Sequence, residues 1–244
     1  MLIGAILLAA FLCVALPLRG YRRWLRHDFA TSTPRYLAET VVLIGSLVWM
    51  LRFYGIRAET LGLSWSPLSK FLLKTIFCLT VIVGLDLLSL YVAGAAPRTT
   101  RTKENRGYGR LSARSQPVGV LSQGMATFDC VVIFLCGAVW EELCFRGVPL
   151  SLWVHGTVSL LAVTVGSSLI FALQHLRRGP GAAAYAGFYG ILFSILFVVT
   201  GNLLSVMVAH AGGNLFVTFY TSRESQRRRV AHEMAVALAR IDGL

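Results

Sequence analysis

The stretch CVVIFLCGAVWEELCFRG, residues 130–147, decides how this chain must fold. It is apolar up to Trp140 and then places Glu141, Glu142 and Arg146 within six positions. An ionised side chain at membrane depth costs roughly 2.5–3.5 kcal/mol on insertion scales, so three of them require partners or a function. Two later apolar segments each carry one histidine, in FALQH and in HAGGN. This combination indicates a reactive centre inside a lipid bilayer.

The composition is that of an integral membrane protein. Of the 244 residues, 56% are hydrophobic and 14% are charged, whereas a soluble domain carries about 25% charged residues. The mean hydropathy is +0.67. A chain of this length holds about seven spans of ~20 residues with short loops, and no separate soluble domain. We therefore predict an all-α, polytopic bundle of membrane helices.

Seven apolar segments are the candidate membrane helices. They are residues 2–18, 37–55, 71–96, 128–153, 158–176, 182–200 and 203–220. Basic tracts follow the first, third, fifth and seventh, so alternating spans place all four tracts on one side, which the positive-inside rule makes cytoplasmic. The N-terminus is then predicted to lie outside and the C-terminus in the cytoplasm.

The domain prediction follows from the same segments. Residues 1–222 form one membrane-embedded domain, with the polar motifs confined to 125–221. Residues 223–244 form a basic cytoplasmic tail whose apolar residues recur at helical spacing, as in an interfacial helix.

The placement of the arginines argues against a nucleic-acid site, and the spacing of the cysteines argues against a disulfide framework or a zinc cluster. The net charge of +12 does not indicate nucleic-acid binding, because the arginines flank apolar runs without interleaved aromatic stacking platforms. Membrane lipids, anionic ones in particular, are the favoured partner of these arginines. The five cysteines contain no CxxC pair, so we predict neither a disulfide framework nor a zinc cluster. Cys144, beside the glutamates, is expected to be a buried free thiol.

The two glutamates are predicted to do different work. On a helix, Glu142 and Arg146 are four residues apart and share a face, whereas Glu141 points about 100° away. An ion pair between Glu142 and Arg146 would hold the segment and leave Glu141 available as a general base. Pro149 cannot donate a hydrogen bond to the Phe145 carbonyl, so a kink or helix end is expected there.

Each histidine shares a helix face with a residue four positions away. His175 follows Phe171, which is expected to pack against it, and Asn214 follows His210. An imidazole and a carboxamide side by side can form an oxyanion hole, in which each donor is worth ~3–4 kcal/mol. With turns at Gly156 and Gly201, the glutamates and His175 come to similar depth, whereas His210 needs a tilt or kink to reach them.

The order EExxxR, FxxxH, HxxxN on successive membrane segments resembles the CPBP intramembrane glutamic endopeptidases, the family of CAAX proteases and bacteriocin-processing (Abi-type) enzymes. The resemblance covers about Trp140 to Phe216. It implies eight helices where the apolar pattern gives seven, so the prediction is seven to eight. It also implies an endopeptidase that cuts near the C-terminus of a prenylated protein, a bacteriocin peptide or a sorting tail. The small size and short loops are typical of a prokaryotic member, and hence of the bacterial cytoplasmic membrane.

The resemblance also implies roles for single residues. Glu141 and His175 would activate a water molecule, and His210 and Asn214 would stabilise the oxyanion. The supporting residues would be Glu142, Arg146 and Phe171. No cofactor and no metal is implied, and the sequence makes no prediction of the oligomeric state.

Two alternatives stay open. Glu141, His175 and His210 could supply a zinc site with water as fourth ligand, although HExxH is absent. The same side chains could instead form a proton relay or a non-enzymatic immunity scaffold. Asp86, in VGLDLLSL, also lies inside an apolar segment and is predicted to be a packing or gating residue.

Overall fold

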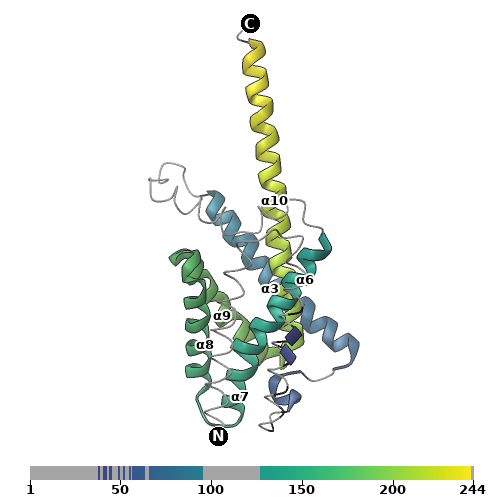
Figure 1. Ribbon diagram of the computed structural model, residues 1–244, viewed down its shortest axis with the longest axis vertical. Helices are drawn as coiled ribbons and strands as arrows, with labels where there is room; N and C mark the ends of the chain where they lie inside the picture. Colours follow the sequence, from purple (N-terminus) through teal and green to yellow (C-terminus); the bar gives the residue numbers. More distant parts are fainter. Residues whose placement is uncertain are drawn as a thin grey trace.

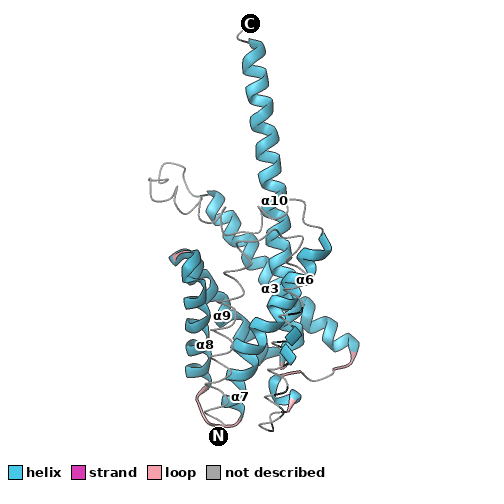
Figure 2. Ribbon diagram, in the orientation of Figure 1, coloured by secondary structure: helices cyan, strands magenta, loops and turns pink. Residues whose placement is uncertain are grey.

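The computed structural model describes residues 57–63, 66–95 and 127–242, together with single positions between 38 and 55. Throughout these residues the regular structure is helical and no strand occurs (Figures 1 and 2). The all-α prediction is therefore confirmed for the described part of the chain.

The elements are short 3₁₀ turns, one π-helical turn and longer α-helices. In chain order they are η1 (Ala58–Leu61), α3 (Leu68–Ala95), α6 (Thr127–Glu142), η3 (Leu143–Gly147), α7 (Val148–Val154), α8 (Leu160–His175), η4 (Leu176–Arg178), α9 (Pro180–Thr200) and α10 (Leu203–Asp242).

Three described helices are long and apolar enough to cross a membrane. They comprise Leu68–Val92 in α3, Pro180–Thr200, which is α9, and Leu203–Glu224 in α10. Helix α8 is apolar but shorter. Of the predicted spans, 2–18 lies outside the described residues, and 37–55 is described only at scattered positions. The prediction of a helical membrane protein is confirmed, and the count of seven to eight spans stays a prediction.

The predicted span 128–153 is not one helix. Helix α6 ends at Glu142, the π-helical turn η3 carries the chain through Leu143–Gly147, and α7 begins at Val148. A kink or helix end was predicted at Pro149, and the boundary lies just before it: Pro149 stands in the first turn of α7, where the missing backbone N–H of a proline is tolerated. Such π-helical turns occur frequently at functional sites.

Glycines in the left-handed conformation end two of the helical segments, as predicted. Gly201 has φ 59° and donates its N–H to the Phe197 carbonyl at 2.7 Å, which ends α9. Gly156 has φ 68° and lies in the turn between α7 and α8. Side chains other than glycine rarely adopt this conformation, so these turns are set by the sequence.

Close helix contacts bring the polar segments together. Helices α8 and α9 lie side by side, and α10 packs against both α3 and α6 (Figure 1). At Gly213 of α10, an added Cβ would lie 2.6 Å from Cγ2 of Ile82 in α3. At Gly190 of α9, it would lie 2.9 Å from the Ser168 Cβ in α8. Small residues at such points allow the close backbone approach on which membrane helix packing depends.

Helix α10 does not end with its membrane segment. It continues through the residues assigned to the basic tail, up to Asp242, and this part projects from the bundle (Figure 1).

The contact at Gly190 generates a stability prediction. Gly190→Ala should be less stable than Gly166→Ala by about 1–3 kcal/mol, because only the former pushes against the α8 backbone. Gly166 is the matched control: it also lies inside a helix, and an added Cβ there meets nothing within 4 Å. Both variants gain the same helix propensity, so their difference isolates the steric effect. Thermal unfolding in detergent measures it, and equal unfolding midpoints would contradict the packing described here.

Candidate active site

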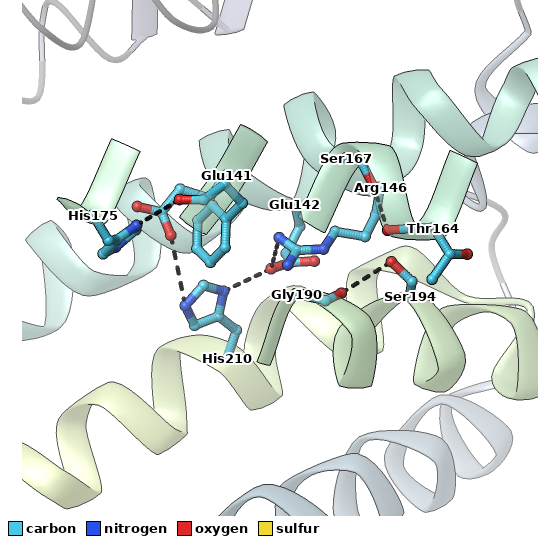
Figure 3. Close-up of polar contacts among 10 residues, drawn as sticks. Glu141, Glu142, Arg146, Thr164, Ser167, His175, Gly190, Ser194 and His210 are labelled. Atoms are coloured by element: carbon cyan, nitrogen blue, oxygen red, sulfur yellow. Dashed lines mark hydrogen bonds and ion pairs between the residues drawn. The ribbon is translucent and has the colours of Figure 1, made fainter. Parts of the chain in front are cut away.

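Side chains from three helices meet at one place in the bundle. Glu141 and Glu142 are the last two residues of α6, His175 is the last residue of α8, and His210 lies within α10 (Figure 3). Ion-pair contacts of 2.7 Å and 3.7 Å join the His210 ring to the two glutamates, 68 and 69 positions away in sequence.

The predicted ion pair between Glu142 and Arg146 is confirmed. Arg146 donates from Nη1 to Oε1 of Glu142 at 3.1 Å, and both side chains are fully buried. The guanidinium carbon lies 4.7 Å from the Phe171 ring centroid and 5.2 Å from that of Phe193. Aromatic faces attract a desolvated cation, so the two rings add to the ion pair in stabilising the buried guanidinium.

Glu142 has a second partner that the sequence did not predict. Nδ1 of His210 lies 2.7 Å from Oε1 of Glu142, the same oxygen that accepts from Arg146. A carboxylate paired with arginine is an acceptor, so the hydrogen of this bond belongs to Nδ1 of the imidazole. The sequence analysis paired Glu142 with Arg146 alone, because helix spacing reports neighbours on one helix and not contacts between helices.

Glu141 has a different environment. Its side chain is 32% exposed, whereas that of Glu142 is 0% exposed. Its Oε2 lies 3.7 Å from Nε2 of His210, too far for a hydrogen bond but close enough for attraction. The two adjacent carboxylates therefore lie in different environments, and their predicted difference in role stays a prediction.

His175 is held by the helix that carries it. Its Nδ1 lies 2.9 Å from the Phe171 carbonyl oxygen, and the Phe171 ring meets the imidazole edge-on at 4.6 Å between centroids. A carbonyl is only an acceptor, so Nδ1 carries hydrogen and Nε2 of the neutral ring keeps a lone pair. Figure 3 shows the Glu141 carboxylate between the two histidines. Phe171 packs as predicted.

Asn214 lies one turn beyond His210 on α10 and is half-buried. Its carboxamide makes no hydrogen bond to another residue in the described part of the chain.

The sequence analysis missed an aromatic partner of the site. The ring of Phe193, on α9, stacks on His210 with centroids 4.5 Å apart and planes at 29°. Aromatic residues recur every four positions on this helix, at Tyr185, Tyr189 and Phe193. This spacing could have predicted an aromatic helix face. Asp86, which was predicted to be a packing or gating residue, accepts hydrogen bonds from the hydroxyls of Tyr185 and Tyr189, and these contacts were not predicted.

One cysteine prediction is wrong. Cys144 is disulfide-bonded, whereas the sequence analysis expected a free thiol. Pairing depends on distance in the folded chain, which motif spacing does not report.

In the residues that the structure describes, no three His, Cys, Asp or Glu side chains converge as ligands of a metal ion.

One comparison with known proteins found a match to a family model. Residues 123–216 match the family model described as type II CAAX prenyl endopeptidase Rce1-like. This range contains all the residues discussed in the site above except Asp86 and includes the stretch on which the resemblance was based. Comparison with curated proteins and with solved structures gave no significant match.

The shared Glu142 oxygen generates a second stability prediction. Arg146→Met should destabilise the protein by about 3–5 kcal/mol, because it leaves a fully buried carboxylate without its strongest partner. The double variant Glu142→Gln with Arg146→Met should recover part of this loss, since neither charge then remains buried. Unfolding of the purified variants in detergent measures both. A double variant less stable than Arg146→Met would contradict the ion-pair account.

Proposed function

The chain belongs to the CAAX protease family, a family of peptidases, and we propose that it is a glutamate-dependent intramembrane endopeptidase. The observation that carries the proposal is the contrast between two adjacent carboxylates. Glu142 is fully buried and holds Arg146 and His210, whereas Glu141 is partly exposed and faces the imidazoles. Glu142 stabilises the site, and Glu141 contacts the substrate.

Glu141 acts as the general base. It takes a proton from a water molecule whose oxygen attacks the carbonyl carbon of the scissile peptide bond. The Nε2 lone pair of His175 accepts the second hydrogen of this water and orients it. When the tetrahedral intermediate collapses, the C–N bond breaks and Glu141 returns its proton to the leaving amine.

His210 and Asn214 stabilise the oxyanion. Doubly protonated, His210 donates Nδ1–H to Glu142 and directs Nε2–H towards the carbonyl oxygen, and Asn214 adds a carboxamide N–H. Donors preorganised in a poorly solvated site are worth ~3–4 kcal/mol each in the transition state. The proximity of Nε2 to Glu141 supports this placement. The water that Glu141 activates attacks the same carbon that carries the oxyanion, so the base and the oxyanion donor must lie close together.

The family implies a protein substrate, and the site lies among membrane helices. We propose that the enzyme cleaves a membrane-associated or prenylated protein, a bacteriocin-like peptide or a sorting tail near its C-terminus. Its proposed location is a bacterial cytoplasmic membrane, with the N-terminus outside and the C-terminus inside. Residues 1–222 form the proposed membrane domain, and 223–244 the cytoplasmic tail.

Glu141→Gln should lower the rate of cleavage by orders of magnitude while leaving the protein folded. A lost general base lowers the rate by about 10²–10⁴-fold, and this side chain holds no other described element by a hydrogen bond. The test compares membrane-protein termini in cells that express the wild type or Glu141→Gln at equal levels. Termini that appear with the wild type and vanish with the variant also identify the substrate. An unchanged set of termini would contradict the proposal and favour the relay or scaffold.

Asn214→Ala should lower kcat by about 10²–10³-fold with little change in KM, because an oxyanion donor acts mainly in the transition state. Thr218→Val is the control, since Thr218 lies one turn further along α10 and is buried. The assay uses a peptide that spans the cleavage site found by terminal proteomics, with and without a metal chelator. Loss of wild-type cleavage on chelation, restored by zinc, would favour the zinc alternative instead.

A further inference from the structure

A buried acid outside the family match takes no part in the mechanism above. Asp86, on α3, is 2% exposed and accepts hydrogen bonds from the hydroxyls of Tyr185, at 2.5 Å, and Tyr189, both on α9. Both bonds end on the same carboxylate oxygen, Oδ1. Acids within membrane helices are expensive and commonly mark functional sites, so this one requires an explanation.

A row of aromatic rings leads from Asp86 to the candidate active site. On α9, the Tyr185 and Tyr189 ring centroids are 4.5 Å apart, and those of Tyr189 and Phe193 are 5.7 Å apart at an interplanar angle of 62°. Phe193 is 2% exposed, and its ring stacks on the His210 imidazole. The carboxylate is therefore connected to the imidazole through two rings in direct contact.

A second contact places Asp86 beside the same part of α10. At Gly213, an added Cβ would lie 2.6 Å from Ile82 Cγ2 and 3.9 Å from Asp86 Oδ2. Gly213 is three residues after His210 and directly precedes Asn214. Asp86 therefore lies where α3 meets the turn of α10 that carries both proposed oxyanion donors.

We propose that Asp86 is a positioning residue for His210 and acts through Tyr189 and Phe193. The carboxylate fixes the Tyr189 hydroxyl, the Tyr189 ring limits rotation of Phe193, and the face of Phe193 sets the plane of the imidazole. That plane keeps Nδ1 on Glu142 and Nε2 towards Glu141. The catalytic part of this inference rests on the proposed function.

The two tyrosines provide a matched pair of variants. Each donates one hydroxyl to the same oxygen, but of these two rings it is Tyr189 that contacts Phe193, whereas Tyr185 contacts Tyr189. Tyr189→Phe should lower kcat about 10- to 100-fold with KM nearly unchanged, as expected when a catalytic group is misplaced. Tyr185→Phe should leave kcat close to that of the wild type. Equal losses of kcat in the two variants would overturn the proposal.

Variants of Asp86 separate positioning from charge. Asp86→Leu removes the acceptor and should lower kcat at least as much as Tyr189→Phe. Asp86→Asn retains a carbonyl oxygen that accepts both hydroxyls and should recover most of that loss. A kcat for Asp86→Asn as low as the kcat for Asp86→Leu would overturn the proposal. If an Asp86 variant does not fold, the comparison of Tyr189→Phe with Tyr185→Phe tests the proposal instead.

A spectroscopic measurement tests the inference without any cleavage assay. In protein labelled with ¹⁵N-histidine, the His210 ring signals are assigned by their loss in His210→Gln. They should shift in Tyr189→Phe and stay in place in Tyr185→Phe. Unshifted signals in Tyr189→Phe would overturn the positioning role. Shifted signals in a protein whose wild type cleaves nothing would support positioning while the proposed function fails.

Discussion

One carboxylate oxygen, Oε1 of Glu142, joins the parts of the described bundle that carry polar chemistry. It accepts from Arg146 in the π-helical turn and lies against Nδ1 of His210 on α10. In a low-dielectric interior such hydrogen bonds are strong, and loss of one partner is costly for the group that remains. The contact therefore ties the end of α6 to α10 and fixes the orientation of the imidazole. Glu142 is also fully buried, so that the adjacent, partly exposed Glu141 is the carboxylate left to meet a substrate.

The surrounding helices make this contact possible. The π-helical turn after Glu142 contains the buried Arg146, whose guanidinium group bonds the carboxylate and lies over the rings of Phe171 and Phe193. Close approach at Gly213 lets α10 lie against α3 at the level of the site. The two neighbouring glutamates thus acquire different environments from one short segment. Two neighbouring acids in different environments can take different roles, so that one serves as a base and the other as a structural charge.

The parts of this structure that follow from local rules were predictable from the sequence. Spacing of four residues gives the Glu142–Arg146 pair, proline chemistry gives the break before Pro149, and glycine gives the turn at Gly201. Contacts between helices were not predictable in this way. The bond from His210 to Glu142 and the bonds from the tyrosines to Asp86 depend on which helix faces meet, and periodicity within one helix carries no information on that. The disulfide at Cys144 was not predicted, because motif spacing does not report which cysteines are close in the folded chain.

The central claim is that Glu141 activates water while Glu142 only holds the site together. A single turnover in ¹⁸O-labelled water, followed by mass spectrometry of product and enzyme, tests it most directly. General-base catalysis predicts one ¹⁸O atom in the new carboxyl terminus of the product and none in the Glu141 side chain. Label in the Glu141 carboxylate after that turnover would mean that Glu141 had formed a covalent acyl intermediate, and would contradict the account.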